Sequence, residues 1–333
     1  MILFAACSSK QESDTHVQNG MIQLYAGMYS GVTRGSVAIQ SEFFDTGEKI
    51  DVFMSANTAT YPQPIVFTAG AGIDKYNDLS SPQIKAGDSY ADYPPYWPAD
   101  DGTPTDGVNI YAYYPSGKVL TLEYNKTFTV QSDQSSTANY KQSDLMVGTP
   151  ASQGILRTSD RIPLTFTHML SKIIVTLQAD ASFNADQATA NNQLIGATVR
   201  LLNVYPTIAM TERKPASQTL GALTGTPTSI TLGTISSDTE HTTSNDASTP
   251  WQLCAIIPPQ SFTAGQKLIQ IELSNHTSLY YALQANATEA ESQCVSGKTN
   301  IYRITVNQTT ISVAAEINSW TAGNTNTPIE VVM

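Results

Sequence analysis

The sequence predicts an all-β protein of two antiparallel β-sandwiches, and three observations support this fold class. Apolar and polar residues alternate with a period of two along most of the chain, whereas a convincing helical period occurs almost nowhere. Stretches rich in Pro, Asp, Ser and Thr separate the alternating segments, as turns do between strands. The length of 333 residues suits about two domains, and strands without helices between them argue against parallel βαβ units.

Strands are predicted at both ends of the chain, and long polar loops lie between strands. The first strand covers residues 22–29, and its apolar face consists of Ile22, Leu24, Ala26 and Met28. Near the other end the strand residues are Ile301, Ile304, Val306, Ile311, Val313 and Ile317. Residues 77–107 and 236–250 are predicted to be surface loops. Residues 184–194 are expected to form a loop with one turn of helix, because they lack a wide apolar stripe.

The division between the two sandwiches is expected near residues 160–170, just after the turn-rich segment 148–160. The predicted organisation is a signal and tether over residues 1–19, an N-terminal sandwich over 20–165 and a C-terminal sandwich over 166–333.

The first residues predict a lipid anchor. An apolar run ends in Ala5 and Ala6, directly before Cys7. Signal peptidases need small side chains before the cleaved bond, and a cysteine directly after it is acylated in bacterial lipoproteins. We therefore expect Cys7 to carry palmitate or a similar acyl chain, and the six preceding residues to be a truncated signal. The alternative is that this segment is the buried start of a strand.

Composition argues against nucleic acid as a partner, and it does not decide whether two of the cysteines form a disulfide. A net charge of −11 and a pI near 4.7 argue against nucleic-acid binding, which needs Lys and Arg to neutralise phosphates. No other apolar stretch is long enough to predict a membrane-spanning helix. In an oxidising compartment Cys254 and Cys294 either form a disulfide or stay as two separately buried thiols. Their spacing predicts no zinc site.

Catalytic patterns are weak throughout the sequence. His168 alternates onto the same face as Leu164 and Phe166, which favours a core histidine over a catalytic one. The aspartates in the loop, Asp100, Asp101 and Asp106, lack the ligand spacing of a calcium loop and are expected to be solvated. No nucleophile elbow of the GxSxG type is present. We therefore predict no catalytic residue, no cofactor and no metal, and a protein that is not an enzyme.

Several segments, in their order and spacing, resemble one family. They are GEKIDVFMSAN (47–57), YWPADDGTPTDGVNIYAYYP (96–115), QSDLMVGT (142–149), PLTFTHMLSKIIVTL (163–177), IIPPQSF (256–262) and SGKTNIYRITVNQTTISVAAEINSWTAG (296–323). On these segments the chain resembles the fimbrillin-family lipoproteins of Bacteroidales-type bacteria, the type V pilins and their relatives. The resemblance covers about residues 20–333.

The resemblance implies two tandem transthyretin-like sandwiches and assembly outside the outer membrane by strand exchange. It implies that an arginine-specific protease removes the tether and the first strand, after which a strand of another subunit fills the groove. On this chain the cleavage site would be Arg34 and Gly35, and the displaced strand would carry Ile22, Leu24, Ala26 and Met28. The donor strand would be residues 328–333, with Ile329, Val331 and Met333 facing inward. The alternative for Arg34 is an ordinary solvated turn residue.

Aromatic residues support an alternative hypothesis, in which the protein binds glycans. The predicted loop contains Tyr90, Tyr93, Tyr96 and Trp97, whose rings could stack on sugars or on a protein partner. The family resemblance instead implies that Trp97 closes the edge of the first sandwich. Trp251 and Trp320 border predicted strands and are expected in the core or at the domain junction.

The predicted function is that of a lipid-anchored structural and adhesive fimbria subunit on the cell surface. Its expected partners are other pilin subunits, the outer membrane through the lipid, and a ligand on a host or bacterial surface. The alternatives are a monomeric surface glycan-binding lipoprotein and, more weakly, a carbohydrate-active enzyme with paired carboxylates.

Overall fold

Strands form nearly all of the regular structure in the part of the chain that the computed structural model describes. The described residues are 21–28, 44–55, 64–73, 76–84, 97, 107–118, 126–210, 220–234, 251–307 and 311–319. The all-β prediction is confirmed. The helices are short: α1 (Thr137–Gln142), α2 (Gln187–Asn192) and α3 (Glu289–Ser292).

Seven strands of the N-terminal part close into a barrel in the order β1-β4-β3-β2-β5-β7-β8. They are β1 (Leu24–Met28), β2 (Lys49–Ser55), β3 (Ile65–Ile73), β4 (Tyr76–Ile84), β5 (Asn109–Tyr114), β7 (Met146–Thr149) and β8 (Ile162–His168). Strand β1 runs parallel to β8, and the other neighbouring pairs are antiparallel. The sequence predicted a β-sandwich here, and in the structure β1 joins β4 to β8 and closes the sheet into a barrel. A closed sheet has no free edge.

The C-terminal part consists of smaller sheets around a second core. One four-stranded sheet has the order β13-β10-β16-β17, and another has the order β14-β9-β19-β20. Their strands are β9 (Ser171–Ala179), β10 (Thr198–Val204), β13 (Thr228–Thr231), β14 (Trp251–Ile257), β16 (Lys267–Glu272), β17 (Ser278–Ala282), β19 (Lys298–Val306) and β20 (Ile311–Ser319). A three-stranded sheet contains β6 (Lys126–Thr129), β11 (Thr207–Met210) and β12 (Leu220–Thr224), and β15 (Gln260–Ser261) pairs with β18 (Gln293–Cys294).

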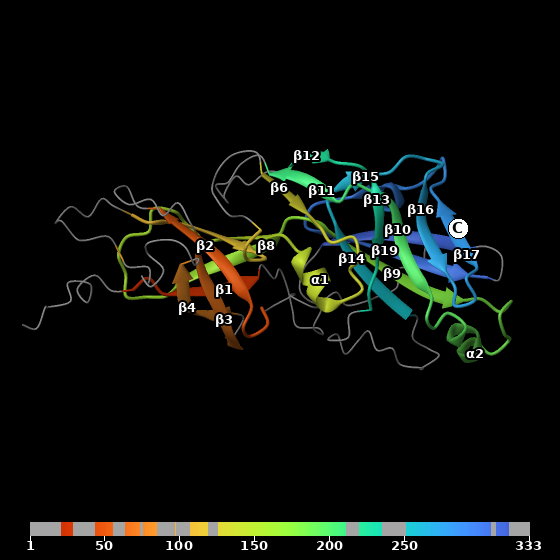
Figure 1. The fold of residues 1–333 in the computed structure, drawn as a ribbon, viewed down its shortest axis with the longest axis horizontal. Helices are drawn as coiled ribbons and strands as arrows, with labels where there is room; N and C mark the ends of the chain where they lie inside the picture. The colour runs from red at the N-terminus through yellow and green to blue at the C-terminus, as the bar shows by residue number, and fades with distance from the viewer. Residues whose placement is uncertain are drawn as a thin grey trace, which may run out of the picture.

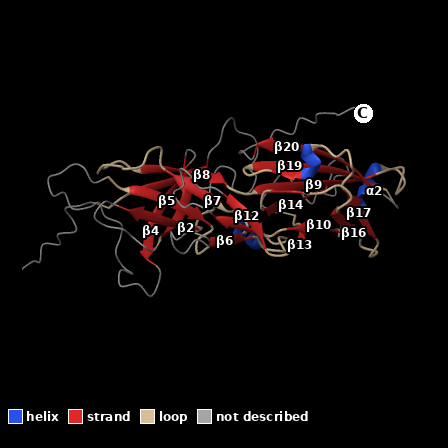
Figure 2. Cartoon of the chain, turned by 90° about the horizontal axis from the view of Figure 1, so that it is seen from above, coloured by secondary structure: helices blue, strands red, loops and turns tan. Residues whose placement is uncertain are grey.

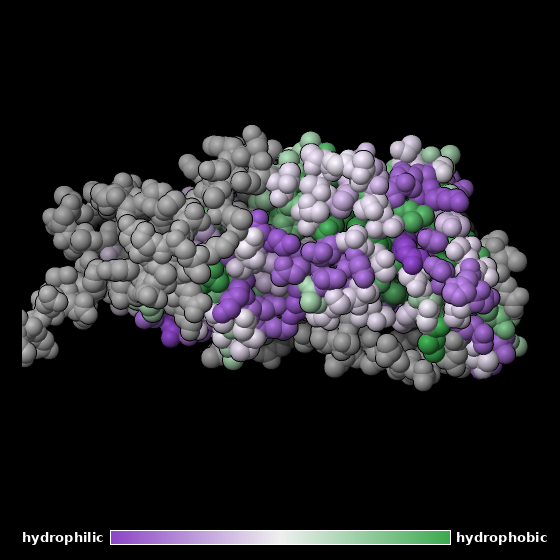
Figure 3. Space-filling view, viewed as in Figure 1, coloured by the Kyte–Doolittle hydropathy of each residue, from purple (hydrophilic) through white to green (hydrophobic). Residues whose placement is uncertain are grey.

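The molecule is elongated, with the barrel at one end and the C-terminal sheets at the other (Figures 1 and 2). On the face shown in Figure 3, hydrophilic and neutral residues cover most of the described surface, and apolar atoms appear only in small separate patches. The large apolar side chains of the described residues lie mainly in two cores.

One wall of the barrel belongs to both cores. Along β2, Val52 faces the barrel core and Phe53 faces the second core, and β5 alternates in the same way with Ala112 and Tyr113. The rings of Phe53 and Tyr113 meet edge to face, with centroids 5.8 Å apart. Because alternate residues of a strand point to opposite faces, the two strands bury side chains on both sides.

Several sequence predictions can be compared with the observed elements. The single helical turn expected in residues 184–194 is confirmed as α2, whose first turn is capped by Asp186: the backbone N–H of Thr189 donates to its carboxylate at 2.9 Å. The predicted terminal strands are observed as β1, β19 and β20. Residues 236–250 lie outside the described residues.

The predicted loop over residues 77–107 is wrong at its start, because β4 occupies Tyr76–Ile84. Asn77 takes an inward position and is fully buried. Its side chain accepts from the backbone N–H of Phe44 at 2.7 Å, and its amide donates to the carbonyls of Phe44 at 2.9 Å and Gly70 at 2.8 Å. A polar residue that satisfies its hydrogen bonds can replace an apolar one in the core, so this strand lacks the expected apolar alternation.

The division of the chain between residues 165 and 166 remains a prediction. Strand β8 runs through these residues to His168, and β9 begins at Ser171. Strand β6, which precedes β7 and β8 in the chain, pairs with β11 in the three-stranded sheet.

Gly148 provides a test of barrel packing. A Cβ at this position of β7 would lie 2.5 Å from the ring of Phe166, its partner on β8. Overpacking of this kind costs about 1–3 kcal/mol, so we expect Gly148→Ala to lower the free energy of unfolding by that amount, measured by urea denaturation. Adding Phe166→Leu should recover part of the loss. Equal stability of Gly148→Ala and the wild type would contradict this packing.

Candidate functional site: the groove of the first strand

Strand β1 is the candidate functional element, because it closes the barrel. Its backbone pairs on both sides, with Leu24 opposite Leu79 of β4 and opposite Ile162 of β8. The backbone N–H of Ile162 donates to the carbonyl of Gln23 at 2.9 Å. Removing β1 would therefore leave two unpaired strand edges, at β4 and at β8.

Ile22 and Gln23 directly precede β1 and continue its alternation of buried and exposed residues. The inward side chains of this segment fill pockets of the barrel core. Ile22, Leu24 and Ala26 are at most 1% exposed. Burial of each large apolar side chain contributes about 1.5–3 kcal/mol, so the vacated groove would expose a substantial apolar surface. These residues lie where the sequence placed the displaced strand. Met28 is the last residue of β1, and its side chain lies outside the described part.

The side chain of Arg161 crosses the outward face of β1. Its Nε donates to Oε1 of Gln23 at 3.1 Å, and its guanidinium lies 4.9 Å from the ring centroid of Tyr25. On the far side of β1, Nη1 of Arg161 lies 3.2 Å from Oδ1 of Asp78 on β4. Arg161 directly precedes β8, so its side chain bridges β8 and β4 over the outside of β1. Sequence reasoning missed this contact, because nothing in the sequence pairs Arg161 with Asp78.

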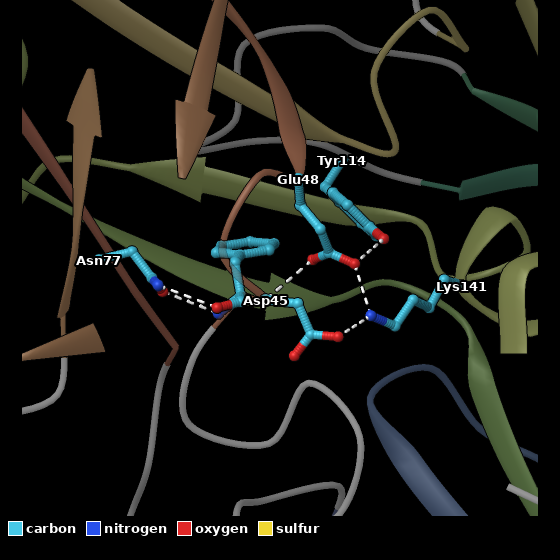
Figure 4. Close-up of polar contacts among 6 residues, drawn as sticks. Asp45, Glu48, Asn77, Tyr114 and Lys141 are labelled. Atoms are coloured by element: carbon cyan, nitrogen blue, oxygen red, sulfur yellow. Dashed lines mark hydrogen bonds and ion pairs between the residues drawn. The ribbon is translucent and has the colours of Figure 1, made fainter. Parts of the chain in front are cut away.

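A polar cluster fastens the segment before β2 to α1 (Figure 4). The ammonium of Lys141 donates to Oε1 of Glu48 at 2.7 Å and also forms an ion pair with Asp45. The hydroxyl of Tyr114 donates to the same oxygen of Glu48 at 3.1 Å. Burial by itself lowers the pKa of Lys141, but the two carboxylates outweigh it and raise that pKa above its usual value. The cluster thus links the barrel to the helix that lies between β6 and β7.

His168 and the three loop aspartates are the residues that the sequence analysis considered for catalysis or metal binding. His168 is largely buried, and its Nδ1 lies 2.9 Å from Oδ1 of Asp144, which agrees with a core histidine. Among the described residues no group of three or more His, Cys, Asp or Glu side chains could hold a metal ion. Asp100, Asp101 and Asp106 lie outside the described part.

The structure describes both later cysteines and two of the three tryptophans. Cys254 and Cys294 do not form a disulfide with each other, and burial raises the pKa of Cys294 to about 12. Trp97 is buried in the barrel core, and Trp251 packs against the second core. Tyr90, Tyr93, Tyr96 and Trp320 lie outside the described residues. The described part of the chain therefore offers no tryptophan ridge for stacking on sugars.

The other predicted site residues lie outside the described part of the chain. They are the lipidation residue Cys7, the cleavage residues Arg34 and Gly35, and the donor residues Ile329, Val331 and Met333. Their roles stay predictions. Within the described residues, none of the helices is long and apolar enough to cross a bilayer.

A family model described as fimbrillin-like matches residues 33–320. The chain belongs to the fimbrillin-like family. This fimbrillin-like protein is 25% identical over 323 residues to a Bacteroides uniformis protein named "Putative fimbrium subunit Fim1C", with 97% of this chain and 93% of the relative covered. The family resemblance predicted from the sequence is thereby confirmed, and the family is one of fimbrial proteins rather than of enzymes.

Two solved structures share the fold of this fimbrillin-like protein. A "putative cell adhesion protein" from Bacteroides uniformis superposes with a TM-score of 0.63 at 20% identity, covering 91% of this chain and 98% of that one. A second one, from Bacteroides ovatus, has a TM-score of 0.59 at 14% identity and covers 92% and 99% of the two chains.

The Lys141 cluster of the fimbrillin-like protein generates a stability prediction. Lys141→Met removes the cation beside Glu48, whose side chain is only 14% exposed. Losing a charged hydrogen bond at a partly buried site costs about 1–3 kcal/mol, which urea denaturation at pH 7 would measure. Because the folded-state pKa of Lys141 is raised, its contribution is complete below the unfolded value of about 10.4 and disappears as the pH rises through the folded value. The difference between variant and wild type should therefore shrink in strongly alkaline buffer.

Lys118→Met, in the turn after β5, is the matched control and should change the stability by less than about 0.5 kcal/mol. An equal loss in both lysine variants would show that the cluster does not stabilise the fold.

Proposed function

We propose that this fimbrillin-like protein is a structural and adhesive subunit of a cell-surface fimbria, assembled by exchange of its first strand between subunits. One observation supports the exchange above all: β1 closes the barrel, and it is the barrel strand that precedes Arg34. The other six barrel strands follow residue 44. A cut after Arg34 would separate β1 from them without breaking any of these strands.

After such a cut, β1 would be held by non-covalent contacts alone. Its five residues pair with β8 and three of them also pair with β4, and only a few large side chains anchor it in the core. Its departure would leave an open groove with two strand edges and apolar pockets, which is unfavourable in water. A strand of another subunit relieves this state through ladder hydrogen bonds and burial, the mode of recognition called β-augmentation.

The donor would be residues 328–333 of a second copy. Ile329, Val331 and Met333 alternate with the period of Ile22, Leu24 and Ala26, so they suit the same row of pockets. Pro328 suits the start of such a strand, because it has no N–H for a central ladder position.

The lipid anchor would act before assembly. Cys7 lies ahead of β1, so a cut after Arg34 would release the lipidated tether and the first strand together. In this order of events the anchored precursor is held at the outer membrane, and cleavage makes it available for polymerisation.

Limited proteolysis tests the exchange. Trypsin should cut the folded protein first after Arg34, as identified by mass spectrometry, because the glycines near this site favour entry into a protease cleft. The cut protein should then form ladders of oligomers on SDS gels. A chain truncated after Asn326 should fold and be cut in the same way, yet it should terminate polymers when mixed with the full-length protein, because it can accept a strand but cannot donate one.

Each part of that prediction can be contradicted by a result of its own. Arg34 among the last sites cut would contradict the cleavage site, and normal polymers of the truncated chain would reject the donor role. A truncated chain that does not fold would mean that residues 328–333 are the closing strand of the C-terminal part instead.

A labelling experiment tests the anchor. Expressed in a lipoprotein-processing bacterium behind a complete signal, the protein should incorporate a fatty-acid probe and sediment with membranes. Cys7→Ser should abolish both, whereas Cys254→Ser should change neither. Equal labelling of the wild type and Cys7→Ser would exclude Cys7 as the lipid attachment site.

A further inference from the structure

Arg161 contacts β1 from outside the barrel, and it remains in place when β1 leaves. It belongs to the segment that enters β8, and its ion-pair partner Asp78 belongs to β4. Both strands border the groove. Without β1 the guanidinium would lose the side-chain oxygen of Gln23 and the ring of Tyr25, while it could keep Asp78.

A guanidinium has five N–H donors, so Arg161 paired with Asp78 retains donors for the strand that enters next. The two contacts to β1 come from successive outward positions, Gln23 and Tyr25. An incoming strand would therefore present its own outward side chains to Arg161 at these two positions.

We infer that Arg161 selects the incoming strand by its outward side chain, and that its partner is the carboxylate of Glu330 in a second copy of this chain. The inference rests on the proposed strand exchange. In the donor sequence Pro328-Ile329-Glu330-Val331-Val332-Met333, Glu330 is the charged residue between two apolar ones. When Ile329 and Val331 face the core, Glu330 faces outward, because successive side chains of a strand alternate.

The pairing holds in two registers in which the donor runs in the direction of β1 and Ile329 takes a described inward position. If Ile329 takes the pocket of Ile22, Glu330 replaces Gln23, which accepts a hydrogen bond from Arg161. If Ile329 takes the pocket of Leu24 instead, Glu330 replaces Tyr25, whose ring lies under the guanidinium. Either register exchanges a neutral partner of Arg161 for a carboxylate, which forms a stronger, charge-assisted hydrogen bond.

The charges around the groove limit how much the pair of Arg161 and Glu330 would contribute to binding of the incoming strand. Arg161 would lie between two carboxylates, Asp78 and Glu330, and its side chain is 40% exposed. Ion pairs at exposed positions are weak and screened by salt. The pair would therefore tune which strand enters and how fast it enters, while the inward apolar residues provide most of the affinity.

A charge-swap experiment on the full-length chain tests the inference. The wild type, Arg161→Glu, Glu330→Lys and the double variant are cut after Arg34 with an arginine-specific protease, which leaves a lysine at position 330 intact. Polymer formation is followed at low ionic strength. Each single variant should polymerise about two- to fivefold more slowly than the wild type, and the double variant should return to within about twofold of it. In about 1 M salt the differences should disappear.

Two controls separate donor entry from other effects. Arg161→Glu also removes contacts to β1, so the release of the N-terminal fragment is measured for each variant, and Glu330→Lys should leave that release unchanged. Arg200→Glu makes the same charge change at a partly buried ion pair with Glu272 in the C-terminal part, and it should polymerise like the wild type.

The possible outcomes distinguish this inference from the function on which it rests. Polymers that form normally with Glu330→Lys, or penalties that add in the double variant, would overturn the pairing of Arg161 with Glu330 and leave strand exchange standing. A cut wild-type protein that forms no polymer would overturn the proposed function and the pairing together.

Discussion

The barrel depends on one short strand for its closure. Strand β1 supplies the ladder partners of both β4 and β8 and fills core pockets with Ile22, Leu24 and Ala26. Without this strand the remaining six-stranded sheet would have two edges and an exposed row of pockets, a state that another strand with the same alternation would relieve. In the proposed exchange, the stability of the intact subunit and its uptake of a new strand after cleavage would therefore have the same physical origin.

The position of β1 in the barrel makes its loss compatible with an intact remainder. Counted either way around the sheet, β1 is three strands away from the pair β2 and β5. These two strands also bury side chains in the second core, where Phe53 meets Tyr113. The wall opposite the groove is thus held by the C-terminal sheets, while the groove lies on the side that does not share that core. We expect an open barrel supported in this way to retain the geometry that a new strand needs.

The elements that could be predicted are those whose pattern is local. Strand β1 follows from the alternation of Ile22, Leu24 and Ala26, and α2 from a short segment that lacks an apolar stripe. Strand β4 could not be predicted, because Asn77 takes a core position and satisfies its polar atoms with partners far away in the sequence. Closure of the barrel and the bridge from Arg161 to Asp78 likewise depend on which strands become neighbours, and alternation alone does not specify pairing.

The two faces of β1 perform different physical tasks. Its inward residues are aliphatic and make no hydrogen bond through their side chains, so the pockets they leave would accept many strands with the same period. Discrimination between such strands has to come from groups that respond to charge or shape on the outer face. Among the described contacts of that face, Arg161 and Asp78 are the charged pair that spans the groove, and Gln23 and Tyr25 mark the positions that an incoming side chain would occupy. In the proposed exchange, a groove of this kind would combine a permissive interior, which provides affinity, with a charged outer rim that restricts which strand enters it.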